Sequence, residues 1–304
     1  MDILKVNSIV KRFGDFEAVS NVTFSVEQGT VFGLLGPNGA GKTTTIRMMT
    51  NILKPDEGEV SLFGEKVGSL QQNRIGYLPE ERGLYKKIKV IDQLIYFGQL
   101  KGMSRSDAQS EARKWLKKLD AETWETKKIQ ELSKGMQQKV QFITTILHNP
   151  DLLILDEPFS GFDPINTEII KKIISDLKSE GKTIILSTHI MEQVEQLCDH
   201  ICLIDKGKMI LSGMVREIKK NYGRDTILME WDGDDLFLNE FSNIKYINRS
   251  NNRAEFRITD GLTPMLILQK ASQKNNIYKF ELAEPSLNEI FIDVVTKQGV
   301  DNES

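Results

Sequence analysis

The sequence predicts an α/β fold built on a mainly parallel sheet, followed by a small α+β domain. Two continuous apolar runs, residues 152–155 and 183–186, are typical of parallel strands buried on both faces. A glycine-rich segment separates an apolar, strand-like stretch at 30–35 from a helix-compatible run at 42–51. After Gly213 the pattern changes, and short strands and helices alternate in a new order.

The glycine-rich segment is the most informative part of the chain. It fits the pattern G-x-x-x-x-G-K-[ST], whose backbone amides close around the β-phosphate of a nucleotide. The phosphates would lie at a helix N-terminus, where free amides favour negative charge. Lys42 can then reach the β- and γ-phosphates, and the Thr43 hydroxyl can bind Mg²⁺. The phosphate loop comprises Gly36, Pro37, Asn38, Gly39, Ala40, Gly41, Lys42, Thr43 and Thr44. The sequence therefore predicts a nucleoside triphosphate site.

Length, net charge and cysteine content limit the classes of protein to which this chain can belong. The 304 residues allow one large domain, or one large and one small. A net charge of −3 provides no basic field for phosphate backbones, so we expect no nucleic-acid partner. No apolar run approaches the roughly 20 residues that span a bilayer, and the first residues lack the apolar core of a signal peptide. With only Cys198 and Cys202, a reducing cytoplasm is the expected location.

The first two thirds of the chain read as an α/β core with a helical insert. Between residues 90 and 138 apolar residues repeat at intervals of three and four, as in Ile91, Leu94 and Ile95. A turn at 54–58 leads into a short strand. Further strands are expected at residues 3–6, 17–19, 22–26 and 75–78.

The last 80 residues read as a separate small domain that follows a linker at 221–225. Its elements follow the order β-α-β-β-α-β, which is typical of a ferredoxin-like fold. Strands are expected at 226–231, 245–248, 254–258 and 278–282, and helices at 235–243, 263–274 and 286–296.

The apolar strand at 152–155 ends in two acids, Asp156 and Glu157. A strand end of this kind places Asp156 beside the Mg²⁺ held by Thr43. Glu157 is then positioned to polarise a water for attack on the γ-phosphate. In open α/β sheets, ligands bind at the carboxyl ends of the strands, which agrees with this placement. The alternative is an acidic strand end that only faces solvent.

Residues 132–138 (Leu-Ser-Lys-Gly-Met-Gln-Gln) resemble the signature loop of ATP-binding-cassette (ABC) ATPases, usually L-S-G-G-Q. The resemblance extends from residue 1 to about 215, with the motifs in the family's order. Phe13 matches the aromatic residue that stacks on adenine, since a flat apolar ring tolerates any base. Residues 160–164 resemble the loop that links the two subunits' sites, and 187–189 resemble the switch-histidine segment.

The resemblance implies hydrolysis of ATP to ADP and phosphate, with ATP and Mg²⁺ bound. Ser133 and Gly135 would contact the γ-phosphate of ATP held by a partner subunit, so a homodimer or paralogous heterodimer completes each site. His189 would hydrogen-bond the γ-phosphate and position the attacking water. The cassette would span 1–220, with its helical subdomain at about 83–138, and an accessory domain would span 225–304.

Two residues depart from the family's pattern. Glu80 occupies the position of a Gln that usually follows the Gly-Tyr-Leu-Pro strand. A glutamate can still bind Mg²⁺, and more strongly because of its charge, but it cannot donate a hydrogen bond as Gln does. Met136 replaces the signature's last Gln.

The implied function is that of a cytoplasmic ATPase subunit which drives a separate membrane permease from the inner face of the membrane. Residues 80–85 and 284–291 resemble bacterial subunits that export sodium or antibiotics. The accessory domain could support the dimer, which we expect by default, or dock the permease or sense a ligand. The alternative is a soluble ABC ATPase that acts on ribosomes or nucleic acid. The basic run Lys86, Lys87 and Lys89 is either a solvated face or a contact with a membrane partner.

Overall fold

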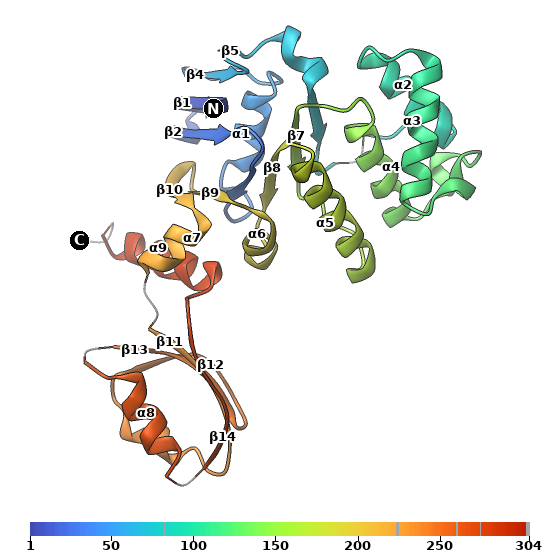
Figure 1. Cartoon of the computed structure of the whole chain (residues 1–304). Coiled ribbons are helices and arrows are strands. Elements are labelled where there is room, and N and C mark those ends of the chain that lie inside the picture. Colours follow the sequence, from blue (N-terminus) through green and yellow to red (C-terminus); the bar gives the residue numbers. More distant parts are fainter. Residues whose placement is uncertain (82, 223–224, 260, 274, 302–304) are drawn as a thin grey trace. The chain divides into compact units, whose positions relative to one another are not determined.

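The protein is represented by a computed structural model (Figure 1). It describes residues 1–81, 83–222, 225–259, 261–273 and 275–301, with side chains up to residue 296. The chain forms two compact units, Met1–Val215 and Arg216–Ser304, each of which is described by itself. Within the described residues, every helix is too short or too polar to cross a bilayer.

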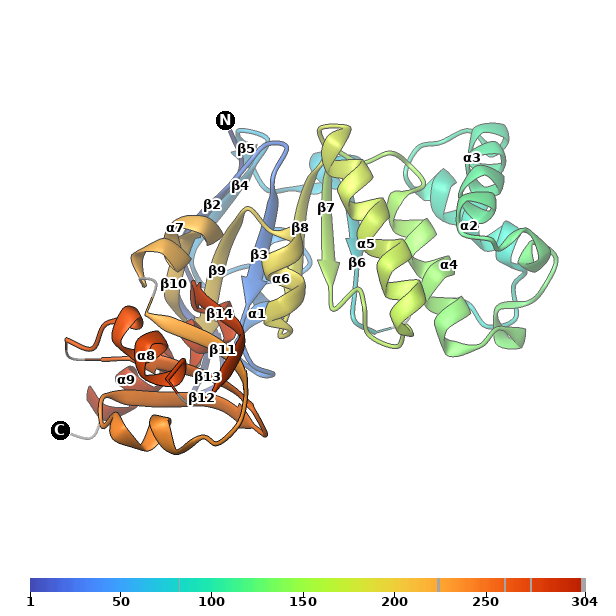
Figure 2. The same ribbon diagram turned by 60° about the horizontal axis from the view of Figure 1, so that its bottom comes forward.

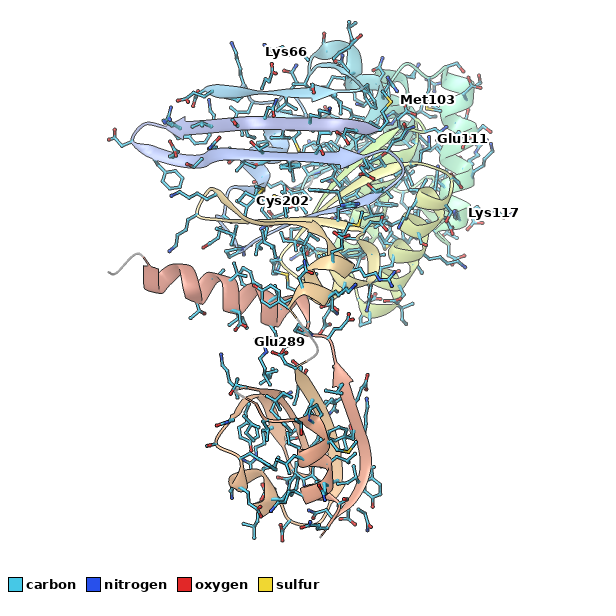
Figure 3. All side chains as sticks on the ribbon, turned by 60° about the vertical axis from the view of Figure 1, so that its left-hand side comes forward. Lys66, Met103, Glu111, Lys117, Cys202 and Glu289 are labelled. Carbon is cyan, nitrogen blue, oxygen red and sulfur yellow. The ribbon has the colours of Figure 1, made fainter. Side chains whose placement is uncertain are left out.

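The first unit is organised around a six-stranded sheet in the order β10-β9-β3-β8-β7-β6. Neighbouring strands from β9 to β6 are parallel, and β10 runs antiparallel to β9. Every residue of β3, β7 and β8 is buried, which explains why these strands read as continuous apolar runs. Cys202 lies within the core on β9 (Figure 3). The strands are β3 (Val31–Leu35), β6 (Ile75–Leu78), β7 (Leu152–Asp156), β8 (Thr183–Thr188), β9 (His200–Asp205) and β10 (Lys208–Met214).

A second, antiparallel sheet in the order β2-β1-β4-β5 packs against the first through helix α1 (Figure 1). Its strands are β1 (Asp2–Phe13), β2 (Phe16–Glu27), β4 (Glu57–Leu62) and β5 (Glu65–Lys66). The expected strands at 17–19 and 22–26 are one strand, because an irregularity in the β1–β2 register at Asn21 interrupts the alternation without ending the pairing. Helix α1 (Lys42–Met49) contributes Ile46, Met48 and Met49 to the shared core.

Helices α5 (Pro164–Ser179) and α6 (Met191–Leu197) cover the other face of the six-stranded sheet (Figure 2). The helical insert lies beside the edge strand β6 (Figure 2). It consists of α2 (Val90–Leu100), α3 (Arg105–Lys118) and α4 (Lys134–Ile146). Short 3₁₀ turns are η1 (Ser69–Arg74), η2 (Glu122–Trp124) and η3 (Ile129–Glu131). Ser104 and Ser133 cap α3 and α4, each accepting a hydrogen bond from a backbone amide three residues further on.

The second unit holds a four-stranded antiparallel sheet in the order β12-β13-β11-β14. This is the order of a ferredoxin-like fold and confirms that prediction. The expected helix at 235–243 is instead a 3₁₀ turn, η4, anchored in the core by Phe237 and Leu238. The expected linker residues Gly223 and Arg224 lie outside the described residues. The elements are α7 (Val215–Asn221), β11 (Thr226–Asp232), η4 (Leu236–Glu240), β12 (Ile244–Ser250), β13 (Arg253–Ile258), α8 (Pro264–Ala271), β14 (Asn276–Ala283) and α9 (Leu287–Asp301).

Candidate nucleotide site

A cavity of about 470 Å³ opens where β3, β6 and β7 end. Parallel strands present their carboxyl ends at one edge of the sheet, so residues far apart in the chain meet there. The phosphate loop follows β3, Asp156 is the last residue of β7, and Glu157 comes directly after it. The cavity is lined by Phe13, Phe16, Ala18, Asn38, Gly39, Gly41, Lys42, Thr43, Thr44, Glu80, Asp156 and Glu157.

The backbone of the phosphate loop requires glycine at two positions. Gly36 has φ 148° and Gly41 has φ 106°, which side chains rarely adopt. A β-carbon on Gly36 would lie 2.1 Å from the Ile204 carbonyl oxygen, and one on Gly41 would lie 2.5 Å from that of Ala18. Gly41 is also the N-cap of α1 and has no side chain to accept the helix's first amides. Those amides remain available to an anion.

The ammonium group of Lys42 lies inside the loop. Its Nζ donates hydrogen bonds to the carbonyl oxygens of Gly36 at 2.7 Å and Pro37 at 3.1 Å. Burial lowers the pKa of Lys42, while the charges of Glu157, Asp156 and Glu80 oppose that change. An ammonium has three donors, so a phosphate oxygen can be bound while the loop contacts are kept.

Thr43 and Asp156 meet directly, since the Thr43 hydroxyl donates to Asp156 Oδ2 at 3.0 Å. Burial raises the pKa of Asp156, and hydrogen bonds from Ser187 and Thr43 oppose this. Among the described side chains no three His, Cys, Asp or Glu residues converge closely enough to hold a metal by themselves. Mg²⁺ is usually held by one or two carboxylates together with phosphates and waters, so an alcohol and a carboxylate beside a phosphate loop fit it.

Glu157, which follows β7, is in direct contact with His189, which follows β8. Glu157 Oε1 lies 2.7 Å from His189 Nδ1, and Glu157 Oε2 accepts a hydrogen bond from the Thr188 hydroxyl at 3.2 Å. The Glu157 backbone has φ 49°, and its amide donates to the Ser187 carbonyl at 2.9 Å. A left-handed conformation at a glutamate is costly and is found most often at functional sites. Here it turns the carboxylate from the end of β7 toward β8.

Two aromatic rings flank the entrance to the cavity. Phe13 and Phe16 are paired across the β1–β2 hairpin and are 52% and 65% exposed. Exposed rings beside a phosphate loop offer an apolar face on which a base can stack.

Glu80 also lines the cavity, directly after the β6 strand and Pro79. Tyr77, on β6, is partly buried near the same acids. Burial raises the pKa of Tyr77 to about 12; the charge of Asp156 adds to this, while Arg47 opposes it. Glu80 is a third carboxylate in the lining of the cavity, besides Asp156 and Glu157, and Thr43 and Asp156 remain the predicted metal-binding pair.

Ser133 and Gly135 do not line this cavity. Ser133 is the exposed N-cap of α4 in the helical insert, and its hydroxyl accepts from the Met136 amide at 3.3 Å. A β-carbon on Gly135 would lie 3.6 Å from the Gly161 carbonyl oxygen, so the signature loop adjoins the 160–164 loop. Ser133 is thus exposed on the insert, and Gly135 is partly exposed beside the 160–164 loop.

Sequence reasoning missed three residues of this site. Phe16 and Ala18 line the cavity, and Thr188 hydrogen-bonds the carboxylate of Glu157. A signal existed for Phe16, because Gly14 marks a tight hairpin that places Phe16 opposite Phe13. No local pattern indicated the Thr188 contact, which depends on the pairing of β7 with β8.

Comparison with known proteins places this site in a family. A family model described as ABC transporter matches residues 19–160. The uncharacterized ABC transporter ATP-binding protein YhaQ of Bacillus subtilis is 44% identical over 293 residues, covering 96% of this chain and 98% of that protein. The chain belongs to the ABC transporter ATP-binding proteins. Members of this family bind ATP, and the predicted fold class and family resemblance are confirmed.

Other relatives extend the similarity of this ABC protein to both units. The linearmycin resistance ATP-binding protein LnrL of Bacillus subtilis is 30% identical, covering 96% of this chain and 98% of that protein. The Nod factor export ATP-binding protein I of Cupriavidus metallidurans is 37% identical, covering 77% and 78%. A model described as the C-terminal domain of DrrA1-3-like ATP-binding proteins matches residues 213–295.

A solved structure of an ABC transporter's ATP-binding subunit superimposes with a TM-score of 0.68 at 28% identity. The match covers 73% of this chain and 93% of that one.

Proposed function

We propose that this ABC protein hydrolyses ATP as one half of a dimer, in which two copies, or one copy and a paralogue, enclose two ATP–Mg²⁺ complexes. One observation carries the proposal. The cavity holds the phosphate loop, the metal-binding pair and Glu157, whereas Ser133 and Gly135 lie outside it on the insert. A γ-phosphate in the cavity is therefore left without a signature loop unless a second subunit supplies one.

In this proposal each group has one role. The phosphate loop and Lys42 hold the phosphates, and Phe13 stacks on the base. Glu157 accepts a proton from the attacking water, and His189 holds that carboxylate and the water in place. Bound Mg²⁺, held by Thr43 and Asp156 with Glu80 nearby, would neutralise charge on the phosphate oxygens. The partner's signature loop would close the site and stabilise the charge that develops on the γ-phosphate.

The proposed work of this ATPase is to power a separate permease, most directly for export. Support comes from the names of two relatives, one a Nod factor export protein and the other a linearmycin resistance protein. The subunit would then lie in the cytoplasm, bound to the inner face of the cell membrane through its permease. Copurification of a multispanning membrane protein with the tagged chain supports this assignment; recovery of ribosomes instead would contradict it.

A groove of about 350 Å³ offers a surface for that permease. It lies between β6 and the helical insert, and its lining is mainly apolar, with Tyr77, Leu84, Phe97 and Leu100 among the lining residues. Leu100 is 57% exposed, which is costly for a large apolar side chain without a partner. We expect a cytoplasmic segment of the permease to fill this groove. A photo-crosslinker at Leu100 should capture the permease, and one at the exposed Ile165 on α5 should not.

We further propose that residues 1–220 form the cassette and 225–304 an accessory domain that supports the dimer. The division into two compact units after Val215 supports a boundary in this part of the chain, five residues before the end of the predicted cassette. Limited proteolysis in the linker should release two stable fragments. If the accessory domain supports the dimer, cleavage should also weaken ATP-dependent dimerisation, as measured by light scattering.

The dimer itself is tested by dilution. Specific ATPase activity should fall as the protein concentration drops below the dimer dissociation constant. Activity per chain that stays constant down to concentrations where only monomer is detected would contradict the proposal.

A further inference from the structure

Two distant lysine-rich segments of the insert are joined by backbone pairing. Lys89 and Lys128 form an isolated antiparallel bridge. Around it the Val90 amide donates to the Lys127 carbonyl at 2.9 Å, and the Ile129 amide donates to the Ile88 carbonyl at 3.0 Å. The segment that follows β6 and Glu80 and the segment before the signature loop thus lie side by side and form one surface. The sequence alone indicated only the first of the two.

The paired segments carry five exposed lysines, Lys86, Lys87, Lys89, Lys127 and Lys128, here named the basic patch. Within the described part of the chain, none of their ammonium groups forms an ion pair or hydrogen bond. Of the neighbouring acids, Glu125 is bound by Arg113 at 2.8 Å, whereas Glu131 accepts from the Lys128 backbone amide at 2.9 Å and places one negative charge beside the five lysines. The patch is therefore strongly positive in a chain of net charge −3.

Apolar side chains of the same segment are also partly exposed, and one of them, Tyr85, packs part of its ring against Tyr96 and Phe97 of α2. Tyr85 is 50% exposed and Ile88 is 38% exposed, on either side of Lys86 and Lys87. Lysines around an exposed tyrosine and isoleucine form the combination that binds anionic bilayers, in which ammonium groups meet headgroups and apolar side chains enter the interface. Lysine ammonium groups are compact point charges, whereas bidentate recognition of a single phosphate favours arginine.

We propose that the basic patch binds the anionic phospholipid surface of the membrane directly, in addition to any contact made by the permease. The biological role of this contact rests on the proposed function, which brings the subunit to the membrane. Because the contact needs neither nucleotide nor permease, it can be measured on the isolated chain. Its failure and the failure of the ATPase proposal are therefore distinguishable.

The test is flotation of the intact, nucleotide-free chain with vesicles of phosphatidylcholine that contain 0 or 40% phosphatidylglycerol. The test variant is Lys86→Gln/Lys87→Gln/Lys127→Gln. The control, Lys66→Gln/Lys117→Gln/Lys172→Gln, removes the same charge from exposed lysines on β5, α3 and α5 (Figure 3 labels Lys66 and Lys117). Each lysine near an anionic surface strengthens binding about fivefold, so losing three should weaken it about 100-fold. Raising the salt concentration to 0.5 M should also release the wild type.

The expected result is binding of the wild type and control to anionic vesicles only, with the test variant bound about 100-fold more weakly. Equal losses in the test and control variants would show a diffuse charge effect and overturn the proposal. Absence of wild-type binding to anionic vesicles would overturn it too. So would wild-type binding to single-stranded RNA that competes the vesicles away, since that would assign the patch to nucleic acid. A thermal unfolding midpoint equal to that of the wild type confirms that each variant is folded.

Discussion

Glu157 and His189 lie 2.7 Å apart, Oε1 to Nδ1, although 32 residues separate them in the chain. The contact arises because β7 and β8 are neighbours in the sheet and end at the same edge. Glu157 lines the cavity and is 9% exposed, whereas the His189 side chain is 51% exposed and is not among the residues that line the cavity. The pair thus joins a buried carboxylate to an accessible imidazole, the arrangement expected of a base and the group that orients it.

Replacing Glu157 with Gln should separate binding from chemistry. The amide keeps the shape of the side chain but cannot accept the water's proton, so hydrolysis should fall by roughly 10²-fold or more while ATP still binds. The nucleotide-bound dimer should accumulate, which gel filtration with ATP and Mg²⁺ detects. Glu180→Gln, at an exposed glutamate after α5, should change neither quantity. Normal hydrolysis by Glu157→Gln would show that another group is the base.

His189→Ala should reduce hydrolysis by about 10-fold to 10²-fold with little effect on ATP affinity, because the imidazole orients the carboxylate. Since the two residues act as one unit, the double variant with Glu157→Gln should be no slower than Glu157→Gln alone. Single-turnover assays measure all three rates. Additive losses would indicate that the two residues act independently. His200→Gln, on β9, is the matched histidine control.

Lys42→Ala should abolish tight ATP binding, because the described lining of the cavity then holds no ammonium group and keeps three carboxylates. Lys101→Ala is a close control. Its ammonium also donates to two backbone carbonyls, of Gln72 and Ile75, and burial lowers its pKa as well. That variant should lose stability but keep its affinity for ATP. Fluorescent-nucleotide titration and thermal unfolding distinguish the two outcomes.

His148 should make the stability of the protein sensitive to pH. Burial, together with the charge of Lys101, lowers its pKa from 6.5 to about 4, and its Nε2 lies 3.1 Å from the Ile75 carbonyl oxygen. The unfolded chain therefore binds a proton between pH 6.5 and pH 4 that the folded protein does not. The contribution of His148 to the free energy of unfolding is therefore fully present above pH 6.5. It is lost as the pH drops toward 4, by about 2 kcal/mol after allowance for partial exposure.

The variant His148→Gln isolates this contribution from that of the carboxylates. Urea unfolding of both proteins at pH 7 and pH 4.5 should show a smaller loss of stability in the variant. An equal loss in both would mean that His148 titrates normally in the folded state.

The sequence predicted the fold where local pattern and tertiary packing agree. Buried parallel strands such as β7 and β8 are apolar throughout, and the phosphate loop is fixed by the glycines that its backbone needs. The sequence pattern predicted the wrong element where tertiary packing determines the local structure. The irregularity at Asn21 hid a single 12-residue strand, and η4 forms only one 3₁₀ turn because few of its residues reach the core. Contacts such as Thr188 with Glu157 depend on sheet order, which periodicity does not encode.

The central claim is that each ATP site needs two subunits, and mixing two inactive variants tests it most directly. Lys42→Ala removes the phosphate contact, whereas Ser133→Arg blocks the exposed signature loop. An equimolar mixture should regain about a quarter of wild-type ATPase activity, since half of the dimers are mixed and each holds one intact site. Ser104→Arg, which removes the equivalent cap from α3, should be fully active alone. A mixture no more active than its two components, measured where mixed dimers are shown to form, would contradict the account.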